Sequence, residues 1–175
     1  MVRDDISQTI TVGIHFVVLG LLTWATASPF LFPSLGPSAY LLAAGEGESE
    51  RASAPYHVIG GHLVAVISGF IAFHLLAPNV VITNVLSASS PASSVTLLRL
   101  AASSVAAMMG TTFFMLVTDT NHPAACATTL IVSLGVLSSL SEVAYIMLAV
   151  VVLVAINGAV YPAMKKLHLE PEEPR

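Results

Sequence analysis

Charged residues divide this sequence into long apolar stretches. No Asp, Glu, Lys or Arg occurs within residues 6–45, 52–98, 100–118, 120–141 or 143–164. Each of these stretches can hold a helix of about 20 residues, the length that crosses roughly 30 Å of hydrocarbon. The pattern therefore predicts a protein embedded in a membrane, with residues 1–175 forming a single transmembrane domain.

The apolar stretches resolve into six expected segments, at residues 8–28, 33–44, 57–77, 95–118, 122–140 and 142–162. Only helices and closed barrels satisfy the backbone in lipid, and strand-like alternation is absent, so we expect an all-α polytopic membrane protein. The second segment rises only about 18 Å. It is either a re-entrant half-helix or the helical part of a broken span.

The six segments also divide into three plus three. Residues 34–39 open the short second segment, as residues 120–125 open the fifth. Interruptions at matching places in two halves are a pointer to a transport site. We therefore predict two three-segment pseudo-repeats, with short or broken helices at segments two and five. Six crossings would make the repeats inverted and four would make them parallel, and the distribution of positive charge allows both.

Composition and charge exclude several classes of protein. Charged residues make up 9% of the chain, against about a quarter in soluble domains. The net charge of −4 and the lack of a Lys/Arg cluster argue against nucleic acid as a partner. The acidic residues beside Arg3 are atypical of a signal peptide, so the first segment is expected to be retained. We expect a plasma (inner) membrane location with both termini cytoplasmic.

The strongest chemical candidate is the polar run at residues 118–123. Pro123 fits the first turn of a helix, which places Asn121 or His122 near the N-cap. The N–H groups of residues 124–126 would then point outward, and such a helix start binds anions. His122 would add a positive charge that depends on a proton. An ordinary interfacial loop is the alternative for this run.

A second helix start of this kind is expected in the first half, at Gly36, Pro37 and Ser38. Glycine permits close approach of the backbone, Pro37 would open the short helix, and Ser38 would offer a hydroxyl and an N–H in the first turn. Two helix starts that face each other would make a small anion site without a fixed cation. A structural turn is the alternative.

Small residues are regularly spaced in two of the long segments. Gly61, Ala65 and Gly69 recur every four residues in the third segment. Such spacing lets membrane helices pack closely, within one chain or between chains. Gly60 and His62 stand beside this stripe, and we expect His62 to reach the pore. A second stripe lies in the fourth segment, at Ala102, Ala106 and Gly110.

Three blocks of this sequence resemble the HPP family of small integral membrane proteins, named for a His-Pro-Pro motif. They are Ser-Leu-Gly-Pro-Ser-Ala-Tyr-Leu-Leu at 34–42, Pro-Tyr-His-Val-Ile-Gly-Gly-His at 55–62 and Asn-His-Pro-Ala-Ala at 121–125. Some members are described as nitrite transporters, so the resemblance implies nitrite as the substrate. Four features depart from the family pattern. The second proline is Ala124, the usual glycine after it is replaced within Ala125-Cys126-Ala127, and the family's Phe-Gly-Ala-Ser reads Leu35-Gly36-Pro37-Ser38. An expected Arg-Asn pair reads Tyr56-His57, which weakens any substrate assignment that needs a cation there.

We therefore expect a membrane transporter or channel for a small monovalent anion, nitrite first, with the proton as a candidate co-substrate. The lipid bilayer and, through the small-residue faces, a second copy of the chain are the other candidate partners. No catalytic residue, cofactor or metal is expected, because no nucleotide loop, nucleophile motif or metal-ligand set occurs. The alternative is a non-transporting membrane sensor or assembly component. The expected substrate-binding residues are Gly36, Pro37, Ser38, Gly60, Gly61, His62, Asn121, His122, Pro123, Ala124 and Ala125.

Overall fold

The computed structural model describes residues 2–44, 51–89 and 91–169, and within these ranges every regular element is a helix. The elements are α1 (Val2–Thr26), α2 (Leu31–Ala44), α4 (Pro55–Leu76), α5 (Ile82–Ser87), α6 (Ser94–Val117), α7 (Ala125–Ser133) and α8 (Leu140–Leu169). The predicted all-helical membrane architecture is confirmed.

Four of these helices are long and apolar enough to cross a membrane. Their candidate spans are Gln8–Thr26, Pro55–Leu76, Ser94–Val117 and Leu140–Ala163. The two other predicted segments are the short helices α2, with 14 residues, and α7, with nine. Helix α7 is shorter than its expected range of 122–140, because Gly135 adopts a φ of 78° and ends it. The Val136 N–H then donates to the Ile131 carbonyl, which completes a Schellman cap.

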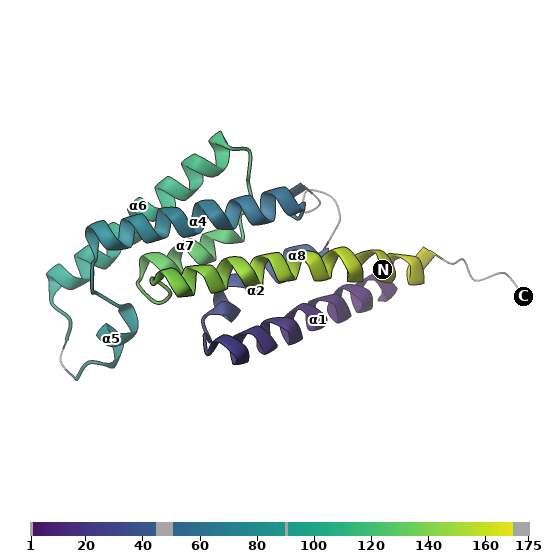
Figure 1. Ribbon diagram of the computed structural model, residues 1–175, viewed down its shortest axis with the longest axis horizontal. Coiled ribbons are helices and arrows are strands. Elements are labelled where there is room, and N and C mark those ends of the chain that lie inside the picture. Colours follow the sequence, from purple (N-terminus) through teal and green to yellow (C-terminus); the bar gives the residue numbers. More distant parts are fainter. Residues whose placement is uncertain (1, 45–50, 90, 170–175) are drawn as a thin grey trace, which may run out of the picture.

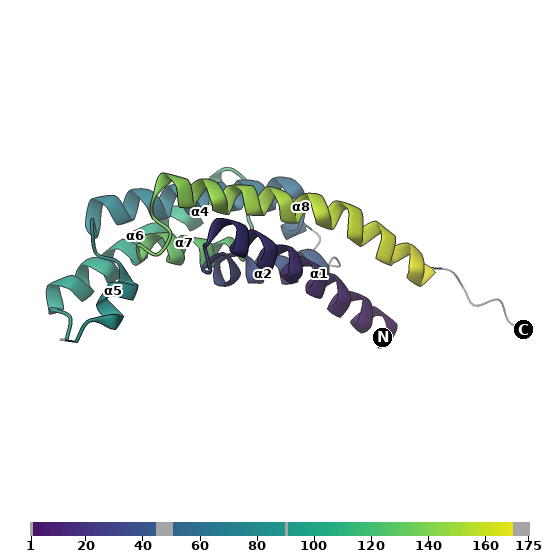
Figure 2. The same ribbon diagram turned by 60° about the horizontal axis from the view of Figure 1, so that its bottom comes forward.

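The helices lie side by side in an elongated bundle, as Figure 1 and Figure 2 show. Helices α1, α4 and α7 run in one direction along it, and α2, α6 and α8 run in the other. The start of α4 lies beside the end of α6, where the Tyr56 hydroxyl donates to the Thr118 carbonyl. We call this the Arg51 end. At the opposite, Arg99 end, the Arg99 guanidinium donates to the carbonyls of Leu76 and Pro78.

The helix contacts of the first half correspond to those of the second. Helix α1 packs on α2 as α6 packs on α7, and α1 packs on α8 as α6 packs on α4. Likewise, α4 packs on α7 as α8 packs on α2, while α2 and α7 contact each other. Exchange of the two halves therefore preserves the main contacts and reverses the direction of every helix. This correspondence supports the predicted pseudo-repeats in their inverted form.

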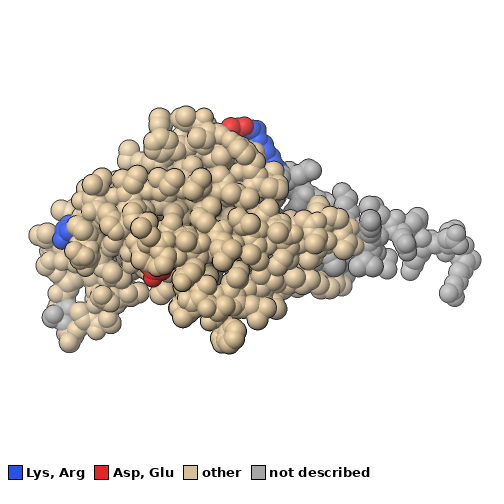
Figure 3. All heavy atoms as spheres, viewed as in Figure 1, with Lys and Arg blue, Asp and Glu red and all other residues tan. Residues whose placement is uncertain are grey.

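Apolar side chains occupy both the core and most of the outer surface. The main core cluster joins α1, α2, α4, α7 and α8, and it includes Leu19, Leu35, Val58, Val132 and Ile146. The face seen in Figure 3 carries few charged side chains among its described atoms. Large exposed apolar surfaces mark contact with lipid or protein, and here they lie along helices of membrane-spanning length.

The two stripes of small residues have different outcomes. The first is confirmed as a packing face, since a Cβ at Gly69 would lie only 2.9 Å from the Cβ of Val132 in α7. The second packs within the chain only at Gly110, where a Cβ would lie 3.4 Å from Ser68 Oγ of α4, whereas Ala102 and Ala106 are exposed. Helix α6 turns a hydroxyl-bearing face inward, because polar groups of α7 need hydrogen-bond partners there. Its buried residues are Leu100, Ser103, Ala107, Thr111 and Met115.

The helix directions predict how the chain crosses the membrane. Arg51 should lie on the same side as the end of α8, and Ser87, exposed on α5, should lie on the opposite side. In a Cys126→Ala background, we expect Arg51→Cys to react with an impermeant maleimide only from the side that exposes a C-terminal tag. Ser87→Cys should react only from the other side. A four-crossing topology would give the reverse result at both positions.

Candidate functional site

A buried polar cluster lies where α2, α4 and the loop before α7 meet. Ser38 Oγ is 3.2 Å from His62 Nε2 and 3.0 Å from His122 Nε2. None of the three residues exposes more than 1% of its surface, and the two imidazole centroids are 5.1 Å apart. We call these residues the histidine–serine cluster. It brings together one predicted residue from each of the three sequence blocks.

Backbone carbonyls fix the orientation of both imidazoles. His62 Nδ1 lies 2.8 Å from the carbonyl oxygen of Val58, and His122 Nδ1 lies 2.7 Å from that of Ala52. Because a carbonyl oxygen only accepts, each Nδ1 must carry a hydrogen. The Nε2 atom of each ring is therefore the one turned toward Ser38.

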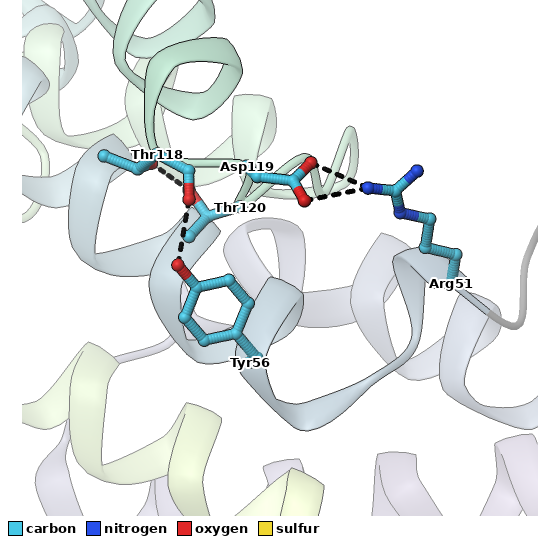
Figure 4. A network of polar contacts seen from close by, with 5 residues as sticks. All are labelled: Arg51, Tyr56, Thr118, Asp119 and Thr120. Carbon is cyan, nitrogen blue, oxygen red and sulfur yellow. Dashed lines mark hydrogen bonds and ion pairs between the residues drawn. The ribbon is translucent and has the colours of Figure 1, made fainter.

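The loop that carries His122 is shaped by the end of α6. Asp119 adopts a left-handed φ of 52°, and the Thr120 N–H donates to the Met115 carbonyl over 3.0 Å. This arrangement is a Schellman cap, which reverses the chain at the end of a helix. Figure 4 shows the result: Tyr56 of α4 reaches the Thr118 carbonyl, and Asp119 points outward. The chain beyond Asp119 then runs back against α4.

Two glycines of α4 make room for this loop. A Cβ on Gly60 would lie 2.5 Å from Thr120 Cγ2, and a Cβ on Gly61 would lie 2.7 Å from His122 Cβ. Both distances are well below ordinary carbon–carbon contact, so any side chain here would displace the loop. The Gly-Gly-His motif therefore has a direct structural reason: the glycines admit His122 to the position where it meets His62 and Ser38.

A cavity of about 320 Å³ opens at the Arg51 end, directly beside the loop. Within it, an Arg51 terminal nitrogen lies 2.8 Å from both carboxylate oxygens of Asp119 (Figure 4), and both side chains are 71% exposed. Ala52 lines the cavity and also holds His122 through its carbonyl, so the cavity and the buried cluster share a wall. The lining residues are Arg51, Ala52, Met115, Leu116, Asp119, Asn121 and Pro123.

The predicted pair of facing helix starts is wrong. Helix α2 begins at Leu31 rather than at Gly36, and Pro37 lies in its interior. The start of α2 is at the Arg99 end, next to the end of α1, whereas α7 starts at the Arg51 end. Pro33, in the first turn, is the proline that occupies a place where no N–H is needed. Gly36 instead packs against the ring of Phe16 in α1.

The backbone amides at the start of α7 are also already paired. The N–H of Ala125 donates to the His122 carbonyl over 3.0 Å, and that of Cys126 donates to the Pro123 carbonyl over 3.1 Å. A tight turn of this kind satisfies the donors that an anion would need. The prediction of outward-pointing N–H groups is therefore wrong for these two residues, and side chains form the site instead.

The remaining predicted residues lie either at the cavity and the start of α7 or outside the site. Asn121 and Pro123 line the cavity, while Ala124 is buried at the start of α7. Pro37 is exposed and lies outside the cluster. His57 is 8% exposed, and its Nδ1 has no hydrogen-bond partner in the described structure.

Sequence reasoning missed a row of buried hydroxyl groups along α7. Ser34 Oγ of α2 is 2.8 Å from Thr128 Oγ1, and Thr111 Oγ1 of α6 is 2.9 Å from Thr129 Oγ1. Further along, the Ser103 hydroxyl donates to the carbonyl of Ser133. The available signal was the spacing of Ser34 and Ser38, which are four residues apart and therefore on one helix face.

A family comparison agrees with these motifs. Residues 2–169 match the family described as "HPP, transmembrane region". The chain belongs to the HPP family. No curated protein and no solved structure matches the sequence. The resemblance inferred from three short blocks therefore extends over nearly the whole HPP chain.

In this HPP protein, the environment of His122 disfavours its charged form. Burial lowers the pKa of His122 from its ordinary value, and the nearby His57 lowers it further, while the hydrogen bond to the Ala52 carbonyl opposes the shift. The residue lies in the loop outside the four candidate spans. An uncharged His122 has an acceptor at Nε2, which faces Ser38.

The close approach at Gly61 can be tested by substitution. We expect Gly61→Ala to lower the free energy of unfolding by about 1–3 kcal/mol, because its Cβ must displace His122 and the Thr120 carbonyl. Gly158→Ala is the matched control, since beyond the neighbouring residues and backbone of its own helix no heavy atom lies within 4 Å of its Cβ. Thermal unfolding in detergent measures both. Equal melting temperatures for the two variants would contradict the proposed role of Gly61.

Proposed function

We propose that this HPP protein transports a small monovalent anion across the membrane, with nitrite as the first candidate substrate. The observation that carries the proposal is the histidine–serine cluster, three polar side chains from separate segments buried inside an apolar bundle. Polar groups inside a membrane protein are costly and mark transport paths and other functional sites. Family membership adds the expectation of a membrane transport protein.

The cavity at the Arg51 end supports anion entry. It offers the guanidinium of Arg51 and the amide of Asn121, both able to donate to oxygen atoms. Arg51 also supplies a cation near the place where Tyr56-His57 replaces the Arg-Asn pair expected from the family resemblance. An exposed ion pair contributes only about 0–1 kcal/mol, so an anion can compete with Asp119 for Arg51 at little cost.

The row of hydroxyl groups along α7 favours transport over the alternative of a sensor or assembly component. It begins beside the cluster at Ser34 and Thr128 and continues through Thr129 to Ser133, toward the Arg99 end. Side chains of this row form hydrogen bonds that connect α2, α6 and α7 in the interior. A protein that only sensed an anion at its surface would have no use for polar contacts across the bundle.

Nitrite also suits the chemistry of the cluster. It is a bent anion with two oxygen atoms, so it can accept hydrogen bonds from two donors at once. The Ser38 hydroxyl and a protonated imidazole nitrogen are donors of this kind. Chloride lacks this two-oxygen shape, and formate shares it. We therefore expect nitrite and formate to compete with each other more effectively than chloride competes with either.

Substitution of His62 tests the role of the cluster. His62→Asn keeps an amide near the position of Nδ1, and therefore the bond to Val58, but removes the Nε2 that faces Ser38. We expect nitrite uptake into proteoliposomes to fall at least about fivefold, because loss of one buried hydrogen-bond partner costs about 1–3 kcal/mol. Uptake of labelled nitrite, corrected for protein-free liposomes, measures the effect.

His74 provides the matched control on the same helix. Its Nδ1 also bonds the carbonyl four residues earlier, at 2.9 Å from Phe70, but the side chain is exposed. His74→Asn should therefore leave uptake unchanged. Equal uptake by the two variants would remove the cluster from the transport path. Folded wild-type protein that moves neither nitrite, nitrate, formate nor chloride would instead favour the sensor or assembly role.

A further inference from the structure

We propose that the histidine–serine cluster binds one proton with each anion, so that the protein moves the two as an electroneutral pair. This inference rests on the proposed anion transport and names its co-substrate. It follows from a count of hydrogen atoms among Ser38, His62 and His122, together with the charges that surround them.

The cluster lacks one hydrogen when both imidazoles are neutral. Each Nδ1 hydrogen is given to a carbonyl, of Val58 or of Ala52, so each Nε2 has only a lone pair. Both lone pairs face Ser38, whose hydroxyl has a single hydrogen to donate. One of the two Nε2 atoms is therefore left without a donor.

One added proton would supply the missing hydrogen. With the proton on His122 Nε2, that nitrogen donates to Ser38 Oγ, and the Ser38 hydroxyl donates to His62 Nε2. Transfer of both hydrogens along this chain moves the positive charge from His122 to His62 and leaves each Nδ1–H bond in place. The cluster can therefore hold one proton on either ring and pass it between them without gaining or losing a hydrogen.

The surroundings do not compensate such a charge by themselves. Asp119 is the nearest carboxylate in sequence, and it is paired with Arg51 at the surface. The other titratable groups of the adjoining segments are the buried His57 and the exposed Tyr56 and His74 on α4, the half-buried Cys126 on α7 and the exposed Tyr40 on α2. On α6 and α8, the charged side chains that the structure describes lie at the Arg99 end.

Charge balance therefore links the proton to the anion. A buried imidazolium without a counter-ion is costly, and so is a buried anion without a cation. Bound together, the two neutralise each other, and the proton supplies the hydrogen bond that the cluster lacks. The binding of either one raises the affinity for the other, and this coupling is reciprocal.

Initial rates of labelled nitrite uptake into wild-type proteoliposomes test the inference. Uptake is measured at several external pH values, and at each pH with and without an inside-negative potential set by potassium and valinomycin. Protein-free liposomes give the passive rate to be subtracted. We expect the rate to rise about tenfold for each unit of fall in external pH while the cluster is mostly unprotonated, because a one-proton site fills in proportion to proton concentration. The potential should not change the rate.

The possible results separate this inference from the proposed function. Uptake that the potential slows and that external pH leaves unchanged would indicate transport of the anion alone, which overturns proton coupling but keeps anion transport. Lack of uptake above the passive rate, from folded protein, would overturn both. His74→Asn should retain the full response to pH. His62→Asn, which leaves a single imidazole beside Ser38, should lose it in whatever uptake remains.

Discussion

The hydroxyl group of Ser38 lies between two imidazole nitrogens, and this shared contact holds together three parts of the chain that are far apart in sequence. Buried polar groups need partners, because the cost of leaving one unpaired is about 1–3 kcal/mol. Helix α2 must therefore keep Ser38 turned toward α4, and the loop before α7 must deliver His122 to the same point. Most other features of the Arg51 end serve that placement.

The short helices are what allow polar residues to meet in the interior. A full-length span would carry its end residues to the membrane surface, whereas α2 has only 14 residues and α7 only nine, so their ends can lie inside the bundle. Helix α7 is preceded by a loop that begins at the cap on α6 and is followed by the turn at Gly135. The His122 loop thus enters the bundle beside Gly60 and Gly61 rather than remaining outside it. The corresponding contacts of the two halves show that each short helix lies between longer ones in the same way.

The sequence was sufficient to predict the apolar segments, and the eleven residues it suggested for a site include the three of the cluster, because both predictions depend on local properties. Long gaps without charge predict membrane helices, and polar residues within them are costly enough to indicate a site. The sequence could not locate the start of α2, since Pro33 and Pro37 both suit a first helical turn. It also could not identify the carbonyl of Ala52 as the partner of His122. Every residue carries a backbone carbonyl, so the residue types do not indicate which carbonyl accepts a hydrogen bond. The exposed α6 stripe and the unpredicted α5 depend likewise on which helices become neighbours.

The observed site, which is formed by side chains, has a different chemistry from the predicted pair of helix starts. Paired helix starts would present a permanent partial positive charge, which attracts anions at any pH. An imidazole pair has no permanent charge, and its ability to attract an anion depends on a proton. Arg51 is a permanent cation, but it lies in the exposed cavity and is paired with Asp119. The permanent charge of Arg51 therefore lies in the exposed cavity, and the charge that depends on a proton lies on the buried imidazoles. Under the proposed transport, the anion would be collected at the surface at any pH, while its passage into the apolar bundle would depend on the proton that accompanies it.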